Sequence, residues 1–354
     1  MNLSKISQIL SLEPKYRLKQ AMDSVYKEFI DDWMKAKTIP LPLREQLNKE
    51  CPLRINAEMF EDKNSKKALL TLDDGSKIET VLMMQSAAES SNESEFESDY
   101  DADSTRNSVC VSSQVGCPLK CDFCATGRLG LKRNLTSNEI VEQVLFWERI
   151  LHRTNERVDN VTFMGMGEPL LNYDNVIEAV RIINSKDGLN IGARKISIST
   201  AGIIAGIKKL AEEPYQVNLA LSLHTPNETM RSVLMPINKT YPLGEVLKEV
   251  ASYIKKTNRK VMIEYIMIQD INDSVETAKY LAHILKKTLK HLFIVNLIPA
   301  NPTGKYQASL PSQIEKFRET LESQDVNVTQ RFRFGRSIKG ACGQLAGAKS
   351  TTKA

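Results

Sequence analysis

From about residue 108 onward, short apolar runs alternate with segments in which apolar residues recur every three or four positions. The runs are rich in β-branched residues, as in VNLALSLH and KVMIEYIMI. Continuous apolar runs of this length are typical of strands in a parallel sheet with covered faces. The predicted strands are 108–113, 158–165, 195–200, 217–224, 260–268, 291–299 and 326–332.

The segments between these runs have helical periodicity. SNEIVEQVLFWERIL has Ser137 as its predicted N-cap, followed by an apolar stripe at Ile140, Val144 and Leu151. Comparable patterns are YDNVIEAVRIIN, IIAGIKKLAEE, PLGEVLKEVASYIKK, VETAKYLAHILKK and SQIEKFRETLES. Strands that alternate with helices predict an α/β fold with a parallel sheet, as an open or closed (β/α) barrel.

The first hundred residues follow another pattern. Residues 1 to about 60 suggest helices, and ALLTLDDGSKIETVLM suggests a hairpin around Asp74–Gly75. We therefore expect a mostly helical accessory domain at 1–68 and a hairpin with an insertion at 69–107. The barrel core is expected at 108–349 and a short tail at 350–354.

Charge is unevenly distributed along the chain of 354 residues. Residues 84–105 hold seven acidic residues and no basic one, so the rest of a chain with net charge +5 carries +12. The serine-rich, acidic composition of this segment predicts a disordered surface insertion. Residues 326–354 hold six Lys or Arg and no acidic residue. A basic remainder is compatible with an RNA partner without demanding one.

The chemistry that the sequence suggests begins with CPLKCDFC, which places Cys117, Cys121 and Cys124 within eight residues. A structural zinc site normally takes four ligands, and the remaining cysteines and the histidines are scattered. The N-terminal stretch has no apolar h-region, and no apolar run approaches the ~20 residues of a membrane-spanning helix. We therefore expect reduced thiols in a cytoplasmic protein. Three thiolates suit a 4Fe–4S cluster with one open iron, whereas a non-catalytic zinc-containing RNA-binding protein is the alternative.

Polar residues and glycines also follow the other predicted strands. The strand ends are MGMGEPLLN, STAG, SLHTPN and NLIPANPTG. Turn composition alone explains any one of them. Four such ends together with a three-cysteine loop indicate a ligand site at the carboxyl edge of the sheet.

The Cys-x3-Cys-x2-Cys spacing, with Phe123 before the last cysteine, resembles the motif of radical S-adenosylmethionine (SAM) enzymes. In that superfamily the open iron chelates the amino and carboxylate groups of SAM. VCVSSQVGCPLKCDFCATG, MGMGEPLLN, LSLHTPNETMRSVLMPINKTYPL, LIPANPTG and GACGQLAG together resemble the bacterial 23S rRNA adenine-C2 methyltransferases, which also methylate an adenosine in tRNA. The resemblance spans about residues 14–349. It implies a partial (β/α)6 barrel preceded by a small helical domain.

A related family methylates C8 of the same rRNA adenine and shares most of these motifs. Pro169 after Glu168 favours the C2 family, since the C8 relatives tend to have alanine there. C8 methylation remains the alternative.

The resemblance also implies roles for individual residues. The cluster ligands are Cys117, Cys121 and Cys124. The SAM contacts are Gly167, Glu168, Ser199, Ser222, Leu223, His224 and Asn301. Cys342 carries a methyl group during turnover, Cys110 is the second catalytic cysteine, and Glu79 is the proton acceptor. Cys51 matches no functional position.

The implied reaction uses two SAM molecules per turnover, because adenine C2 is an electron-poor carbon and not a nucleophile. The first methylates Cys342, and the second gives a 5′-deoxyadenosyl radical that activates this methyl group for addition to C2. The implied partners are 23S rRNA, tRNA and a one-electron reductant such as flavodoxin or ferredoxin, and we expect a monomer. In the N-terminal helices, Lys15, Tyr16, Arg17 and Lys19 suit either RNA contact or an ordinary solvated face.

Overall fold

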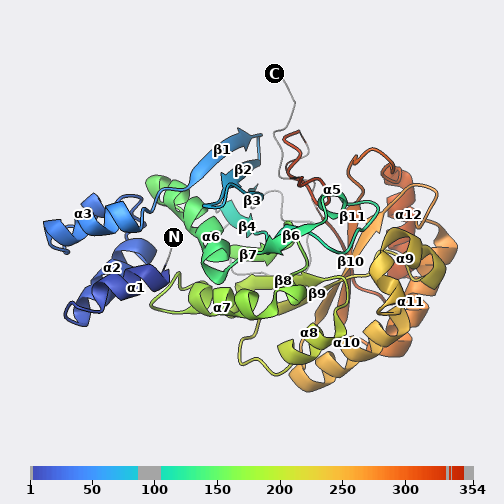
Figure 1. Cartoon of the computed structure of the whole chain (residues 1–354). Helices are drawn as coiled ribbons and strands as arrows, with labels where there is room; N and C mark the ends of the chain where they lie inside the picture. Colours follow the sequence, from blue (N-terminus) through green and yellow to red (C-terminus); the bar gives the residue numbers. More distant parts are fainter. Residues whose placement is uncertain (1–2, 87–104, 332–334, 336, 347–354) are drawn as a thin grey trace.

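The computed structural model describes residues 3–86, 105–331, 335 and 337–346. Most of the acidic segment lies outside the described residues, so its predicted disorder stays a prediction. Ten of the described strands form one large sheet in the order β1-β2-β3-β4-β7-β8-β9-β10-β11-β12 (Figure 1). Their bounds are β1 Asn56–Glu61, β2 Ser65–Thr71, β3 Lys77–Ser86, β4 Thr105–Cys110, β7 Asn160–Phe163, β8 Ile196–Thr200, β9 Asn218–Ser222, β10 Val261–Met267, β11 Phe293–Pro299 and β12 Val328–Gln330.

From β4 to β12 every neighbouring pair is parallel, and the strands follow one another in chain order. Helices connect them on the outer side of the curved sheet in Figure 1. They are α6 Ser137–Leu151, α7 Tyr173–Asn184, α8 Ile204–Leu210, α9 Glu228–Leu234, α10 Leu243–Thr257, α11 Val275–Leu289 and α12 Pro311–Glu322. This arrangement confirms the predicted partial (β/α) barrel.

Helix α6 shows how the apolar stripe builds the outer layer. Ile140, Val144 and Leu151 are buried, as predicted. The N-cap is Thr136 and not Ser137, because Thr136 and Glu139 form a reciprocal capping box. Its hydroxyl accepts from Glu139 N, and Glu139 Oε2 accepts from Thr136 N at 2.8 Å.

The N-terminal helices form a separate group at one side of the sheet (Figure 1). They are α1 Leu3–Leu10, α2 Tyr16–Tyr26 and α3 Leu41–Glu50, joined through a short 3-10 turn at Trp33–Lys35. Trp33 is fully buried and donates from Nε1 to the carbonyl oxygen of Cys51 at 2.8 Å. Cys51 thus lies in the packing of this group.

One expectation for this region differs from the structure. The helices end at Glu50, and β1 occupies part of the stretch expected to be helical, because it completes the antiparallel ribbon β1–β2–β3. Strand β2 runs across residue 68, where a domain boundary was expected, and the four-part division of the chain stays a prediction. The hairpin around Asp74–Gly75 is confirmed, and Gly75 has the left-handed φ of +77° that its turn requires.

A small second sheet was not predicted. Strands β5 Gln114–Gly116 and β6 Leu131–Asn134 pair antiparallel on either side of the three-cysteine stretch. The strand predicted at 326–332 is shorter than expected, since β12 is limited to three residues. Among the described residues, no helix has the length and apolar character needed to cross a membrane.

Candidate active site

Strand register places two polar rows on the inner face of the sheet. In the first row Cys110 pairs with Thr162, Thr162 with Ser197, and Ser197 with Asn218. In the second row Glu264 lies between Ser222 and Asn296, and Asn296 pairs with Thr329. Since alternate residues of a strand share a face, the barrel interior is polar at these levels. The first row lines a cavity of about 320 Å³.

The cluster loop, residues 117–124, lies at the carboxyl edge of the strands. Its three cysteines line a second cavity of about 160 Å³. The backbone holds the loop closed, because Cys117 N donates to Gly130 O and Cys124 N donates to Cys121 O, both at 3.0 Å. The two cavities share part of their walls, formed by Met164, Ile298, Arg331, Cys342 and Leu345.

Burial raises the pKa of Cys117 to about 12 and that of Cys121 well above its usual range. The neighbouring cluster-loop thiols raise the pKa of Cys121 further. A metal group that binds thiolates therefore has to displace their protons here. In the described part of the chain, no three His, Cys, Asp or Glu side chains are grouped to hold a single metal ion. A multi-iron cluster differs in this respect, because its cysteines bind different irons.

Glu168 faces the smaller cavity from the end of β7. Its carboxylate accepts from Leu170 N at 3.1 Å and from Ala201 N at 2.8 Å. Burial nevertheless raises the pKa of Glu168 to about 7. Gly167, with φ +102°, precedes it, and a Cβ at this position would lie 2.6 Å from the Gln114 side chain. Only glycine fits this turn.

The ends of β8 and β9 bring further predicted residues to the same cavity. Ser199 and Ser222 lie with their hydroxyls 3.3 Å apart. His224 Nδ1 accepts from Ile266 N at 3.1 Å, and burial lowers the pKa of His224 to about 3, so the ring is neutral. Leu223 differs from its neighbours because its side chain is packed in the hydrophobic core.

Arg231 links the ends of β8 and β9 through hydrogen bonds. It is fully buried and donates to the carbonyl oxygens of Ala201, Ser222 and Leu223 at 2.9–3.2 Å. Its remaining contact is Asn238 Oδ1 at 2.7 Å. One guanidinium group therefore holds together the loops after β8 and β9, which carry several of the predicted SAM contacts.

Residues 337–346, called here the C-terminal loop, contribute to the walls of both cavities. Asn301 Nδ2 donates to Cys342 O at 3.1 Å, while Asn301 Oδ1 is buried without a partner. Beside the cluster loop, Ala125 N donates to Gly343 O at 2.8 Å and Thr126 Oγ1 to Leu345 O at 2.6 Å. The loop that carries Cys342 is thus bonded directly to the residues that follow Cys124.

Cys110 and Cys342 both line the larger cavity. Burial raises the pKa of Cys110 to about 12, and Cys342 raises it further. Cys342 projects into open cavity space and is therefore solvent-accessible, although protein surrounds it and raises its pKa. The positive charge of Arg331 favours the thiolate form, and it therefore partly opposes the rise in the pKa of Cys110 and Cys342.

Glu79, like Leu223, is a predicted site residue that lines neither cavity. It is 1% exposed and pairs with Lys67, whose Nζ lies 2.8 Å from Glu79 Oε1. Its other oxygen accepts from Ala346 N at 2.6 Å. Neither Lys67 nor Glu79 lines either cavity. Its role as proton acceptor stays a prediction.

Sequence reasoning missed Glu264, Arg331 and Lys67. Glu264 Oε1 accepts from Asn296 Nδ2 at 2.9 Å and from Arg331 Nη2 at 3.4 Å. Its Oε2 is buried without a partner, and the residue lines the smaller cavity. A lone carboxylate inside the apolar run VMIEYIM was the available signal, because such a charge is rarely buried without a purpose.

Known proteins resemble both the sequence and the fold. The Radical SAM superfamily model matches residues 111–281. The probable dual-specificity RNA methyltransferase RlmN of Dictyoglomus turgidum is 42% identical over 337 residues, which cover 94% of this chain and 91% of the relative. The Spiroplasma citri protein of the same name is 43% identical, with the same two coverages.

A solved structure agrees with these relatives. The crystal structure of a radical SAM methyltransferase from Sphaerobacter thermophilus superposes with a TM-score of 0.88 at 36% identity, and the match covers 98% of both chains. Membership of the superfamily implies a 4Fe–4S cluster and SAM. The chain belongs to the RlmN family of radical SAM RNA methyltransferases.

Proposed function

We propose that this chain methylates C2 of one adenosine in 23S rRNA and of an adenosine in tRNA anticodon loops, through a methyl group carried on Cys342. The observation that supports this most directly is the placement of the five thiols. Cys110 and Cys342 line one cavity, and Cys342 also lines the cavity that holds the three cluster-loop cysteines.

The residues around the smaller cavity suit a 4Fe–4S cluster held by Cys117, Cys121 and Cys124, with SAM on the open iron. Glu264 Oε2 is a buried acceptor without a partner at this cavity, and Asn301 Oδ1 is a second such acceptor at the adjoining larger cavity; both suit a ligand that carries hydrogen-bond donors. Glu168 provides a carboxylate for the SAM amino group. When bound, the cluster and SAM supply a 5′-deoxyadenosyl radical.

Cys342 and Cys110 perform different steps of the remaining reaction. The thiolate of Cys342 accepts a methyl cation equivalent from the first SAM, and the positive charge of Arg331 offsets part of the rise in pKa that burial causes at this thiol. After the carbon has bonded to adenine C2, the adduct has to lose its C2 proton and return one electron to the cluster, and the Cys110 thiolate then attacks the Cys342 sulfur. An S–S bond forms, the S–C bond breaks, and the carbon keeps the electron pair and takes up a proton to become the product methyl group.

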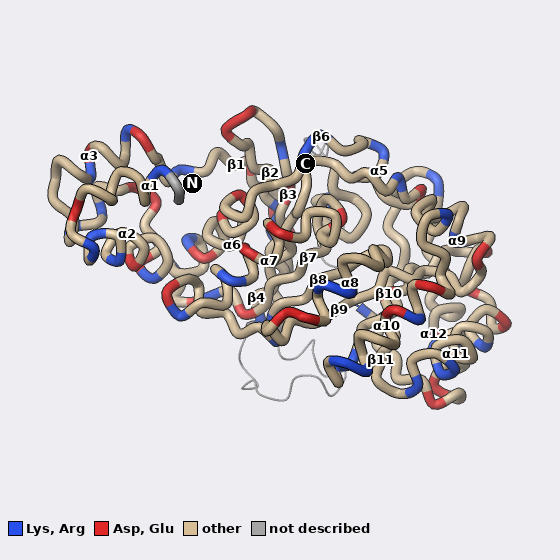
Figure 2. The backbone as a smooth tube through the Cα atoms, turned by 60° about the horizontal axis from the view of Figure 1, so that its bottom comes forward, with Lys and Arg blue, Asp and Glu red and all other residues tan. Residues whose placement is uncertain are grey.

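The basic residues that line the larger cavity suit an anionic substrate. Its lining continues to the amino ends of the strands, where it includes Arg106, Arg194, Lys195 and Lys260. Figure 2 shows Lys and Arg segments beside the labels of β8 and β11. Basic residues at a cavity mouth favour a nucleic-acid backbone, and an unpaired or flipped adenine would enter beyond them.

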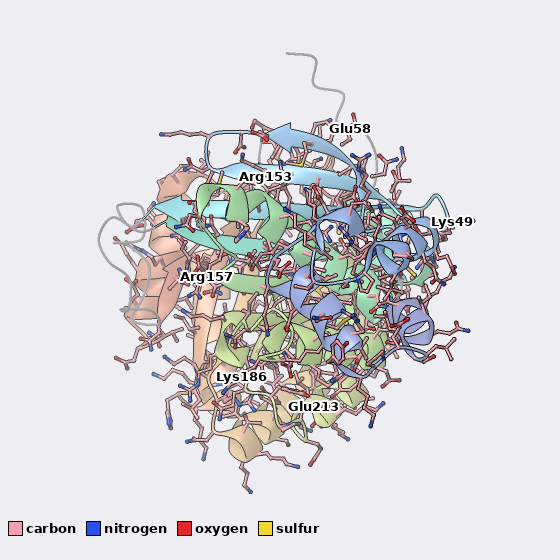
Figure 3. All side chains as sticks on the ribbon, turned by 90° about the vertical axis from the view of Figure 1, so that its left-hand side faces the viewer. Lys49, Glu58, Arg153, Arg157, Lys186 and Glu213 are labelled. Carbon is pink, nitrogen blue, oxygen red and sulfur yellow. The ribbon has the colours of Figure 1, made fainter. Side chains whose placement is uncertain are left out.

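The N-terminal side of the molecule offers less support for RNA contact. Figure 3 shows labelled side chains of both signs on this face: Lys49, Arg153, Arg157 and Lys186, with Glu58 and Glu213. Arg17 donates to Gln20 and Thr38, and Lys19 pairs with Asp23 at 3.0 Å. For the reductant we propose a flavodoxin or ferredoxin, and for the assembly a monomer.

The test compares Cys110→Ala with Cys342→Ala after expression in cells. Without Cys342 no covalent RNA adduct can form, whereas without Cys110 the adduct forms and cannot be resolved. We expect nuclease digestion and peptide mapping to find an RNA remnant on Cys342 in the Cys110→Ala protein alone. Normal release of methylated RNA by Cys110→Ala would contradict the proposal. Mass spectrometry of 23S rRNA from cells with and without the gene distinguishes C2 from C8 as the target.

A further inference from the structure

A buried ion pair fastens the C-terminal loop on both sides of Cys342. Lys67 lies on β2 and Glu79 on β3, and the register of this hairpin places them diagonally on one face. Their charged groups are 2.8 Å apart, and both side chains are at most 2% exposed. Lys67 Nζ also lies 3.3 Å from the carbonyl oxygen of Lys339, to which it donates.

The second contact lies on the other side of the loop. Glu79 Oε2 accepts from the backbone amide of Ala346 at 2.6 Å. Lys339 lies three residues before Cys342, and Ala346 lies four residues after it. The turn between β1 and β2 gives a third contact outside the buried pair, because Ser337 Oγ donates to Asp62 Oδ2 at 2.9 Å.

The energetics of burial make this arrangement informative. Removing two charges from water is costly, and a buried pair is maintained best when further hydrogen bonds complete it. Here one further bond from each partner goes to the same loop. Neither Lys67 nor Glu79 lines either cavity. The pair therefore contacts the loop and not the space where a ligand would bind.

We propose that Lys67 and Glu79 are positioning residues that hold the Cys342 loop at the cavity. The inference builds on the proposed function, in which Cys342 must meet first a methyl donor and then a base. It gives Glu79 a task other than proton acceptance: its two carboxylate oxygens contact Lys67 and Ala346. Lys67, which the resemblance did not implicate, then becomes as important as Glu79.

Two double variants separate positioning from proton transfer. Lys67→Met/Glu79→Leu removes both charges of the pair together, and it removes both loop contacts. Lys67→Met/Glu79→Gln is also neutral, but its amide oxygen can still accept from Ala346 N. Lys66→Met is the matched control, since Lys66 is the neighbouring β2 residue and pairs with Glu61 at 3.4 Å away from the loop.

The first readout needs neither cluster nor RNA. In the cluster-free chain, we expect amide hydrogen exchange at Ala346 to be at least about tenfold faster in the Leu variant than in the Gln variant. Alkylation of Cys342, followed by peptide mapping, should also differ between the two variants. Equal exchange at Ala346 in the wild type and the Leu variant would overturn the proposal, whatever reaction the enzyme performs.

The second readout uses the reconstituted enzyme and RNA. Positioning predicts that the Gln variant keeps methylation within about tenfold of wild type, while the Leu variant loses about a hundredfold. Proton acceptance by Glu79 predicts instead that both variants are equally inactive and accumulate an RNA adduct on Cys342. That result would overturn the proposal. Failure of the wild type to methylate C2 would count against the proposed function alone, because the exchange and alkylation results would stand.

Discussion

The thiols at the two ends of the site are placed in different ways. Those of the cluster loop come from eight consecutive residues whose own backbone hydrogen bonds close the loop. Cys110 and Cys342 come from the first barrel strand and the C-terminal loop, and they meet only because the sheet curves around a shared cavity. The three cluster-loop thiols are therefore brought together mainly by a local motif, whereas the placement of Cys110 and Cys342 depends on contacts between distant segments.

The largest expected effect tests this contrast between the cluster-loop thiols and the other two. Cys121→Ala should lose bound iron and reduce methylation below about one per cent of wild type, because the cluster loses a ligand. Cys342→Ala should lose methylation to the same extent and keep its iron. Iron analysis and visible absorbance of the anaerobically reconstituted proteins check this. Loss of iron in Cys342→Ala would show that the two sets of thiols do not act independently.

A smaller effect is expected at Glu264, which lies between the two sets. Glu264→Gln keeps the shape of the side chain but removes the charge from its buried, unpartnered oxygen. A lost charge-assisted hydrogen bond costs about 1.5–3 kcal/mol, so kcat/KM should fall about tenfold to a hundredfold with iron content unchanged. Glu315→Gln on the surface of α12 is the control. An unchanged kcat/KM in Glu264→Gln would mean that no ligand contacts this oxygen.

The same division explains what the sequence could predict. The cluster loop, the strand-helix alternation and the hairpin at Asp74–Gly75 depend on neighbouring residues, and the structure contains all of them. Thr136 was missed as the N-cap because two hydroxyl residues stand side by side, and only the partner Glu139 decides between them.

Other features could not be predicted because they depend on distant partners. Lys67 resembles any strand lysine until Glu79 and Lys339 surround it. Glu264 acquires its neighbours Asn296 and Arg331 only when β10 and β11 pair. The pairing of Cys110 with Cys342 in one cavity came from the family resemblance and not from local pattern.

A pH effect of moderate size is expected on the binding of SAM, through Glu168. An ionised Glu168 is the form that accepts best from the SAM amino group, and burial raises its pKa to about 7. Its proton must therefore leave when SAM binds below that pH. We expect the affinity of the reconstituted protein for SAM to fall about tenfold per pH unit below 7 and to level off above it.

The corresponding stability effect has the opposite sign. An acid whose pKa is raised in the folded protein binds protons more tightly there, so the SAM-free protein loses stability as the pH rises from about 4.5 through 7. Glu168→Gln should flatten both profiles. Calorimetric titration and urea unfolding between pH 5 and 8.5 measure them, and an affinity for SAM that did not vary with pH would exclude Glu168 from the amino-group contact.

The smallest catalytic effect is expected from shortening the acidic segment. Ser86 and Thr105 face each other at the ends of β3 and β4, so an Asn-Gly turn can replace residues 87–104 and join the strands as a tight hairpin. The cavity residues stay in place, and methylation should remain within about twofold of wild type. The deletion removes seven acidic residues that precede Arg106 in the sequence, and Arg106 lines the larger cavity. Non-specific RNA should therefore bind more tightly at low salt and no differently at high salt. Filter binding of an unrelated RNA across a salt series measures this, and a loss of iron or of methylation would show that the segment serves the site itself.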